Sequence, residues 1–256
     1  MEVYQIVVLC AAAVASSFIK NTAALGAGVF LTPVLAAVFP PKIALGLGAP
    51  ILIATDVSSM KNYWGEWENP KEVLRIGISA IPGVILGACI INVVPNNILK
   101  TGIGTFALLF SVYHLVKESR LYRSIQPSPT TATGDAPLCS GTVSCTLVGV
   151  FGGLASILAH AGGLVFSLYY VGKKLEKRCL MASLIAVFCF SDVVKLIAYL
   201  NIGVLSADSC LIILAMSPII ILGGNLGNFL NRKMRTEVFR KIVLLLVFVS
   251  AINLLL

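Results

Sequence analysis

The chain has 256 residues, of which 58% are hydrophobic and only 12% are charged, and its formal net charge is +8. A soluble globular domain is about 45–50% apolar and about 25% charged, so this composition excludes an ordinary soluble protein and indicates one that faces lipid. The basic excess would suggest nucleic acid in a soluble protein. Here the cations lie in loops between apolar blocks, so we expect no nucleic-acid partner.

Apolar blocks that are nearly free of charge predict ten membrane elements. Several blocks reach the roughly 17–25 residues that a spanning helix needs, and none alternates apolar with polar positions as a barrel strand would. In the first half the predicted elements cover residues 5–19, 23–39, 43–60, 73–93 and 98–117, and in the second half 143–159, 161–172, 179–199, 208–230 and 238–256. We therefore predict an all-α, multi-pass protein of the inner or plasma membrane.

Two further features narrow the class of protein. No basic region precedes the first apolar block, so a cleaved signal peptide is not expected. The seven cysteines contain no CxxC pair, so we expect neither a metal site nor a redox centre, and no cofactor.

The chain repeats itself after a shift of 136 residues, which places Asp56 on Asp192, Tyr63 on Tyr199 and Pro82 on Pro218. Over residues 26–87 the shift gives eleven identities in 62 positions without a gap. Matched aspartates are informative, because a charge is rare inside an apolar block. We expect a first transmembrane repeat over residues 1–117, a cytoplasmic linker over 118–142 and a second transmembrane repeat over 143–256.

The loop cations predict the orientation of the two repeats. If the elements cross the membrane alternately, only Lys42 and Lys100 fall in loops on one side, and the other loop cations fall on the opposite side. The positive-inside rule makes the basic side cytoplasmic, so both termini are expected outside. Five elements per repeat then give the repeats opposite orientations, which is the inverted-repeat architecture of secondary transporters.

The first two elements of each repeat are short and are joined by small or polar residues. The element over residues 161–172 would be only about 18 Å long as a helix, which is less than a bilayer. We expect re-entrant or broken helices at the start of each repeat, with tips that meet near the middle of the membrane. Such paired, glycine-interrupted segments predict the binding site of a transporter.

Four sequence features carry a resemblance to a known family. They are the run from Gly26 to Leu35, the run from Ala159 to Gly163, the Ala54-Thr55-Asp56 step before Tyr63-Trp64, and the Pro-Gly and Leu-Gly pairs within residues 82–87. Over nearly the whole chain they resemble the TauE/SafE family of sulfite and organosulfonate exporters. The family often has prolines after the second Gly-Gly pair, where this chain has Leu164 and Val165. The resemblance implies export of a small anion.

Candidate substrate-binding residues lie at the two tips. They are Lys20, Asn21, Thr22, Gly26 and Gly28 in the first repeat and Ser156, His160, Gly162 and Gly163 in the second. Glycines allow the backbone to approach a ligand, and the free N–H groups of a helix start attract anions. Lys20 is either a surface cation or a charge inside the membrane that needs an anionic partner. His160 either packs structurally or contacts the substrate.

Asp56, Asp192 and Lys195 form a second candidate group. Lys195 follows Asp192 by one helical turn, so a structural ion pair is one interpretation, and coupling to protons or sodium is the other. We favour the structural role, because an anion that leaves a negative interior gains about 2.3 kcal/mol per charge for each 100 mV and needs no coupling ion. Trp64 and Trp67 are predicted interfacial anchors.

The leading hypothesis is a transporter that exports sulfite or a small organosulfonate by alternating access around a midplane site. An importer of a related sulfur oxyanion and a non-transport membrane assembly factor are the alternatives. An enzyme is not expected, because the chain has no GxSxG or HExxH motif and only two histidines. The expected partners are the small anion and the lipid bilayer, and a homodimer is left open.

Overall fold

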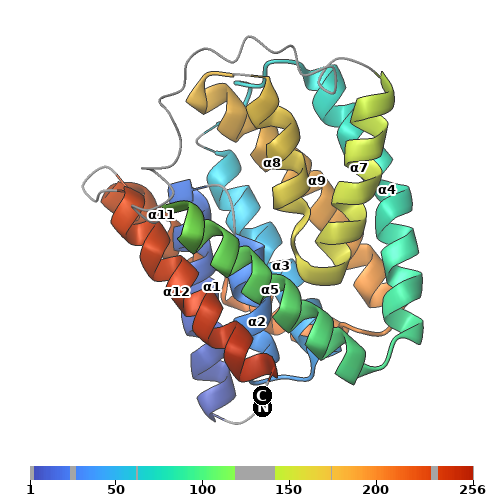
Figure 1. Ribbon diagram of the computed structural model, residues 1–256, viewed down its shortest axis with the longest axis vertical. Coiled ribbons are helices and arrows are strands. Elements are labelled where there is room, and N and C mark those ends of the chain that lie inside the picture. The colour runs from blue at the N-terminus through green and yellow to red at the C-terminus, as the bar shows by residue number, and fades with distance from the viewer. Residues whose placement is uncertain are drawn as a thin grey trace.

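The computed structural model describes residues 3–23, 27–61, 63–118, 142–173, 175–231 and 236–255, and within these ranges it contains helices and no strand (Figure 1). In chain order the helices are α1 (Val3–Ala23), α2 (Ala27–Ala36), α3 (Pro41–Met60), α4 (Pro70–Val93), α5 (Asn96–Glu118), α7 (Thr142–Ala159), α8 (Gly162–Gly172), α9 (Lys177–Asn201), α10 (Ala207–Ala215), α11 (Ser217–Asn231) and α12 (Thr236–Leu255). The predicted all-α class is confirmed.

Several helices are suited to a bilayer. Four segments are long and apolar enough to cross it, namely Tyr4–Asn21, Pro41–Met60, Pro70–Val93 and Arg178–Asn201. Large apolar side chains such as Leu86, Leu168 and Leu222 are exposed on the outer surface, where lipid would cover them. The chain is therefore a multi-pass membrane protein, as its composition predicts.

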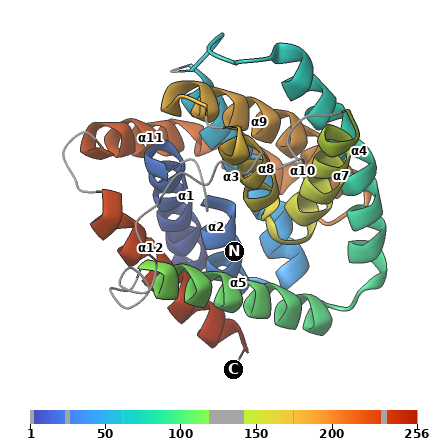
Figure 2. The same ribbon diagram turned by 45° about the horizontal axis from the view of Figure 1, so that its top comes forward.

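Eight of the helices form two bundles. The first bundle contains α1, α2, α3 and α11, and the second contains α7, α8, α9 and α4. α4 packs along α7 and α9, α11 packs along α1 and α3, and the two bundles meet where α3 contacts α9. Figure 1 shows α4, α7, α8 and α9 together on one side of the molecule, and Figure 2 shows α5 and α12 crossing beside the first bundle.

Corresponding helices of the two halves have ends that the 136-residue shift relates. α1 ends at Ala23 and α7 at Ala159, while α3 begins at Pro41 and α9 at Lys177. Each bundle contains the first three helices of one half and the fourth element of the other, because α4 joins α7, α8 and α9 while α11 joins α1, α2 and α3. The two halves are therefore intertwined rather than packed side by side.

Glycines allow the closest of these contacts, between α4 and α7. A Cβ atom on Gly83 would lie 2.0 Å from the Val150 carbonyl oxygen, and one on Gly153 would lie 2.3 Å from that of Ala80. Small residues that bring two backbones together are the usual means of packing helices in a membrane, where burial of apolar surface gives no net advantage over lipid.

One expectation about the short elements is wrong. α1 is long, with 21 residues, whereas α7 ends at Ala159 as predicted and α2 and α8 are short, with 10 and 11 residues. Lys20 and Asn21 therefore belong to the last turns of α1 and not to the joint. The helix continues through them because the Asn21 amide donates to the Ser17 carbonyl (2.9 Å) and Lys20 pairs with a buried carboxylate.

The element predicted over residues 208–230 is two helices, α10 and α11, which are interrupted at Met216. Pro218 lies just after the break, where it lacks an N–H group for a helical hydrogen bond and its ring crowds the preceding turn. The Met216 carbonyl instead accepts the N–H groups of Ile219 (3.0 Å) and Ile220 (3.1 Å), which start α11. The equivalent Pro82 lies inside α4, which continues past it.

Candidate functional site

The turn between α7 and α8 lies against the start of α2. His160 follows α7 with a φ of 52°, a left-handed conformation that is uncommon outside glycine. The N–H group of His160 donates to the Ser156 carbonyl (2.9 Å) and that of Ala161 to the Ala155 carbonyl (3.1 Å), which closes the helix end. A Cβ atom on Gly28 would lie 2.3 Å from the His160 carbonyl oxygen, so only glycine allows α2 this close.

The buried His160 ring connects the two bundles. Its Nδ1 lies 3.3 Å from the Ser156 carbonyl oxygen on α7, and its Nε2 lies 3.2 Å from the Leu45 carbonyl oxygen on α3. The Thr32 hydroxyl of α2 donates to the Gly28 carbonyl (2.9 Å) and, more weakly, to that of Ala159 (3.4 Å). These bonds hold the two tips against each other.

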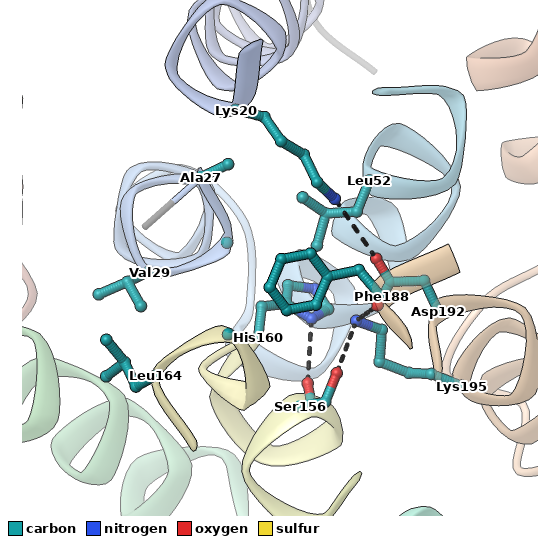
Figure 3. A pocket seen from close by; sticks show the side chains of 12 residues that line it. Lys20, Ala27, Val29, Leu52, Ser156, His160, Leu164, Phe188, Asp192 and Lys195 are labelled. Atoms are coloured by element: carbon teal, nitrogen blue, oxygen red, sulfur yellow. Dashed lines mark hydrogen bonds and ion pairs between the residues drawn. The ribbon is translucent and has the colours of Figure 1, made fainter. Parts of the chain in front are cut away.

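Two lysines and two aspartates form a buried group of charges beside the tips, and Figure 3 shows three of them, Lys20, Asp192 and Lys195. Lys20 pairs with Asp56, and its Nζ lies 4.0 Å from Asp192 Oδ2. Asp192 Oδ1 lies 2.6 Å from Lys195 Nζ, which also donates to the Ser156 hydroxyl (3.3 Å). Each of these four charges has an opposite partner, and such pairing is what the burial of ions away from water requires.

The buried ion pairs border a small cavity between the two bundles. Its volume, taken as the space that the centre of a water molecule can reach, is about 30 Å³, which is room for about two waters. The lining consists of Lys20, Ala27, Gly28, Val29, Leu52, Ser156, His160, Gly163, Leu164, Phe188, Asp192 and Lys195. Polar groups and apolar side chains both contribute, and Lys20 Nζ lies 5.2 Å from the centre of the Phe188 ring.

Two helices begin at this cavity. Ala27 and Gly28 open α2, and Gly163 lies in the first turn of α8. The first N–H groups of a helix have no partner within it, and the helix dipole makes this end positive. The cavity therefore combines lysine side chains with two helix starts, an arrangement that suits an anion.

The lining is related across the two halves. Four pairs of lining residues follow the 136-residue shift, namely Lys20 with Ser156, Ala27 with Gly163, Gly28 with Leu164, and Leu52 with Phe188. Eight of the twelve lining residues thus come from equivalent positions, and the cavity lies where the two halves meet. The other four, Val29, His160, Asp192 and Lys195, line it without an equivalent partner in the lining.

The structure brings most of the residues singled out from the sequence together. Lys20, Gly28, Ser156, His160, Gly163, Asp192 and Lys195 line the cavity. Asn21 faces away and accepts a hydrogen bond from Ser59 (3.1 Å), and a Cβ atom on Gly162 would lie 2.6 Å from the Gly152 carbonyl oxygen, within the α7–α8 contact. Gly26 and the side chain of Thr22 lie outside the described residues.

Sequence reasoning missed the apolar part of the lining. Leu52 and Phe188 carry no chemical signal in so apolar a chain, although the 136-residue shift relates them. The sequence leaves Lys20 either at the surface or buried with an anionic partner; the structure buries it, and the sequence does not identify Asp56 as its partner. That pairing joins α1 to α3, and no sequence spacing encodes it.

Comparison with known protein families gives one match. The family model described as Sulfite exporter TauE/SafE matches residues 8–254, which includes both bundles and every residue that lines the cavity. No curated protein and no solved structure matches the chain.

Proposed function

The chain belongs to the sulfite exporter TauE/SafE family of membrane transporters, and we propose that it exports a small sulfur-containing anion, sulfite or a small organosulfonate. The observation that carries the proposal is the cavity between the bundles, where Lys20, Lys195 and the starts of α2 and α8 surround one space. Two lysines, Lys20 and Lys195, line this space with one aspartate, Asp192, and the second aspartate, Asp56, pairs with Lys20 from outside the lining.

The other walls suit a substrate with a charged head and a small tail. The Ser156 hydroxyl and the His160 ring supply polar groups, while Leu52, Leu164 and Phe188 supply an apolar side. An oxyanion head would lie near the lysines, where charge-assisted hydrogen bonds are strongest. The space holds about two waters, so the bundles must separate slightly to admit a larger anion.

Transport by alternating access would move one bundle against the other across the α3–α9 contact. The matched helix ends and the four equivalent pairs in the lining support a duplicated chain with inverted repeats, around a site that stays fixed. The two termini lie at the same end of the molecule (Figure 1), as the orientation with both termini outside requires. A negative interior then drives an anion outward, by about 2.3 kcal/mol per charge for each 100 mV.

Binding of sulfite, sulfate, thiosulfate and short sulfonates to the purified protein tests the proposal. We expect His160→Ala to weaken binding about tenfold or more, because the ring would exchange its contact with a backbone carbonyl for a hydrogen bond to the anion, and a hydrogen bond to a charged group contributes about 1.5–3 kcal/mol. Thr101→Ala, on the exposed face of α5, is a matched control that should bind normally. Uptake into inverted and right-side-out vesicles gives the direction, and a protein that binds none of these anions would overturn the proposal.

A further inference from the structure

We propose that an exchange of lysine and serine between the two halves gives the two conformations of this transporter different affinities for the anion, with Ser59 taking the place of Lys195 in the weaker one. The inference rests on the proposed alternating access and names a residue outside the cavity described above. It follows from three equivalences and from the present position of each residue.

The 136-residue shift relates Lys20 to Ser156, Asp56 to Asp192, and Ser59 to Lys195. In the second bundle, the lysine that pairs with the aspartate is on the same helix, α9, and the serine is on α7. In the first bundle the lysine is on α1 and the serine is on α3. The lysine and the serine have therefore changed helices, while the aspartate has kept its place.

Both aspartate helices reach the cavity, α3 through Leu52 and α9 through Phe188, but only α9 also presents its aspartate to it. Asp192 and Lys195 line it, whereas their equivalents, Asp56 and Ser59, do not, although four other equivalent pairs line it from both halves. The fully buried Ser59 hydroxyl lies within the first bundle, where it donates to Asn21 Oδ1 (3.1 Å) or to the Thr55 carbonyl (2.8 Å). The present conformation is therefore asymmetric, because the equivalent helices α3 and α9 present different residues to the cavity.

An inverted-repeat transporter reaches its second conformation when the two repeats exchange conformations around the fixed site. Asp56 and Ser59 would then face the cavity, and Asp192 and Lys195 would withdraw into the second bundle. Lys20 and Ser156 form an equivalent pair and remain in the lining. The lining would then hold one lysine instead of two, because Ser59 brings no ammonium group where Lys195 brought one. The anion would be held in one conformation and released in the other.

Transport from each face separately tests the inference. The protein is reconstituted in vesicles, one orientation is inactivated with a membrane-impermeant reagent, and uptake of radiolabelled methanesulfonate is measured with the membrane potential held at zero. This probe carries one negative charge at every pH of the assay, so its own titration does not interfere. We expect KM to differ about tenfold or more between the two faces, the effect of one charge-assisted hydrogen bond.

Variants decide whether Lys195 and Ser59 cause the difference. Lys195→Ser should raise KM at the tight face about tenfold and leave the weak face within about twofold. The double variant Ser59→Lys/Lys195→Ser should restore a difference of opposite sign. Lys173→Ser, which removes a lysine that pairs with Glu72 away from the cavity, should keep the wild-type ratio.

The outcomes separate the two proposals. Equal KM values at both faces of the wild-type protein would overturn the inference and leave transport intact, whereas no uptake of methanesulfonate or sulfite from either face would overturn the proposed function. If the double variant fails to fold, Lys195→Ser alone decides. If Lys195→Ser leaves the ratio of the two KM values unchanged, or raises KM equally at both faces, Lys195 acts structurally and the inference is wrong.

Discussion

The two bundles have the same arrangement of helices but neutralise their equivalent aspartates from different directions. Asp56 receives its lysine from the neighbouring helix α1, and Asp192 receives its lysine from the next turn of its own helix. The charge balance of each bundle is therefore under stronger constraint than the position of either lysine. An unpaired charge inside a membrane protein is costly, whereas the helix that supplies the partner makes little difference to that cost.

The bundles also differ in what surrounds their second helix. α2 packs against α5 and α12 as well as α1 and α3, while α8 packs mainly against α7 and α9. The second half in turn supplies His160, where the shift places Ala24 in the first half. The second half therefore carries more of the polar groups of the cavity, while the second helix of the first half has additional packing against α5 and α12.

Replacing the aspartates gives the largest expected effect. Asp192 lies between Lys195 and Lys20, so Asp192→Asn leaves Lys195 buried without a counter-ion and should cost about 3–5 kcal/mol of unfolding free energy. Asp56→Asn should cost less, because Lys20 remains 4.0 Å from the Asp192 carboxylate. Denaturant unfolding in detergent would measure both.

A charge-balanced variant is the control for this comparison. Asp192→Asn combined with Lys195→Gln removes both members of the pair and should recover a large part of the loss, since no lone charge remains. Equal losses for the two single aspartate variants would show that Asp192 does not serve both lysines.

Alanine at the glycines of the tips should give the next largest effect. Gly28→Ala would place a Cβ atom 2.3 Å from the His160 carbonyl oxygen, and we expect it to destabilise the fold by about 1–3 kcal/mol. Gly163→Ala meets only the end of the Phe188 ring, at 3.2 Å, and its equivalent in the first half is already Ala27. It should therefore be neutral. Thermal unfolding would measure the difference, and a similar loss for both would contradict the contact at Gly28.

A larger side chain at Gly162 tests the second tip in the same way. A Cβ atom there would lie 2.6 Å from the Gly152 carbonyl oxygen and 2.7 Å from Ser156 Cβ, so valine must displace α8 from α7. We expect Gly162→Val to abolish transport while the protein still inserts into the membrane. Vesicle uptake, together with the amount of protein in the membrane fraction, would measure this, and normal uptake would place the substrate path elsewhere.

The backbone of His160 gives a smaller effect. Its φ of 52° costs a non-glycine residue about 1 kcal/mol, and glycine adopts it freely. His160→Gly should therefore be about 1 kcal/mol more stable than His160→Ala, while both bind the anion about tenfold more weakly than the wild-type protein. Binding and unfolding of the same three proteins would test this. Wild-type affinity in His160→Gly would show that the ring does not contact the substrate.

The sequence predicts the features that are local or repeated. The apolar blocks predict the helices, the glycine-rich joints predict the hairpin tips, and the three-residue spacing of Asp192 and Lys195 predicts their ion pair. It does not predict contacts between helices, such as Lys20 with Asp56 or Leu52 with Phe188 across the cavity, because the crossing of two helices depends on packing over their whole length. The sequence does not predict the helix break at Met216 either, because Pro82, the equivalent of Pro218, lies inside the unbroken helix α4.

The smallest expected effect concerns ion pairs at the rim of the second bundle. Arg178 pairs with the exposed Glu66 (2.6 Å), while Lys173 pairs with Glu72, and both members of that second pair are largely buried. The 136-residue shift relates Arg178 to Lys42 and Glu66 to Ile202. Because isoleucine carries no charge, the equivalent positions cannot form this ion pair. Glu66→Gln should lower the thermal midpoint slightly, and Glu72→Gln should lower it more, because an exposed pair is weakened by water and salt.

The pH dependence of the Glu66 pair follows from its partner. The hydrogen bond from Arg178 lowers the pKa of Glu66 below its ordinary value. A carboxyl whose pKa is lower in the folded protein stabilises it above the pKa of the unfolded chain, and this contribution disappears as the pH falls through the folded value. The thermal midpoints of the wild-type protein and Glu66→Gln should therefore differ at neutral pH and converge in acid. A difference that persists in acid would mean that Glu66 acts through packing, and the rim of the second bundle would then differ from that of the first in shape and not in charge.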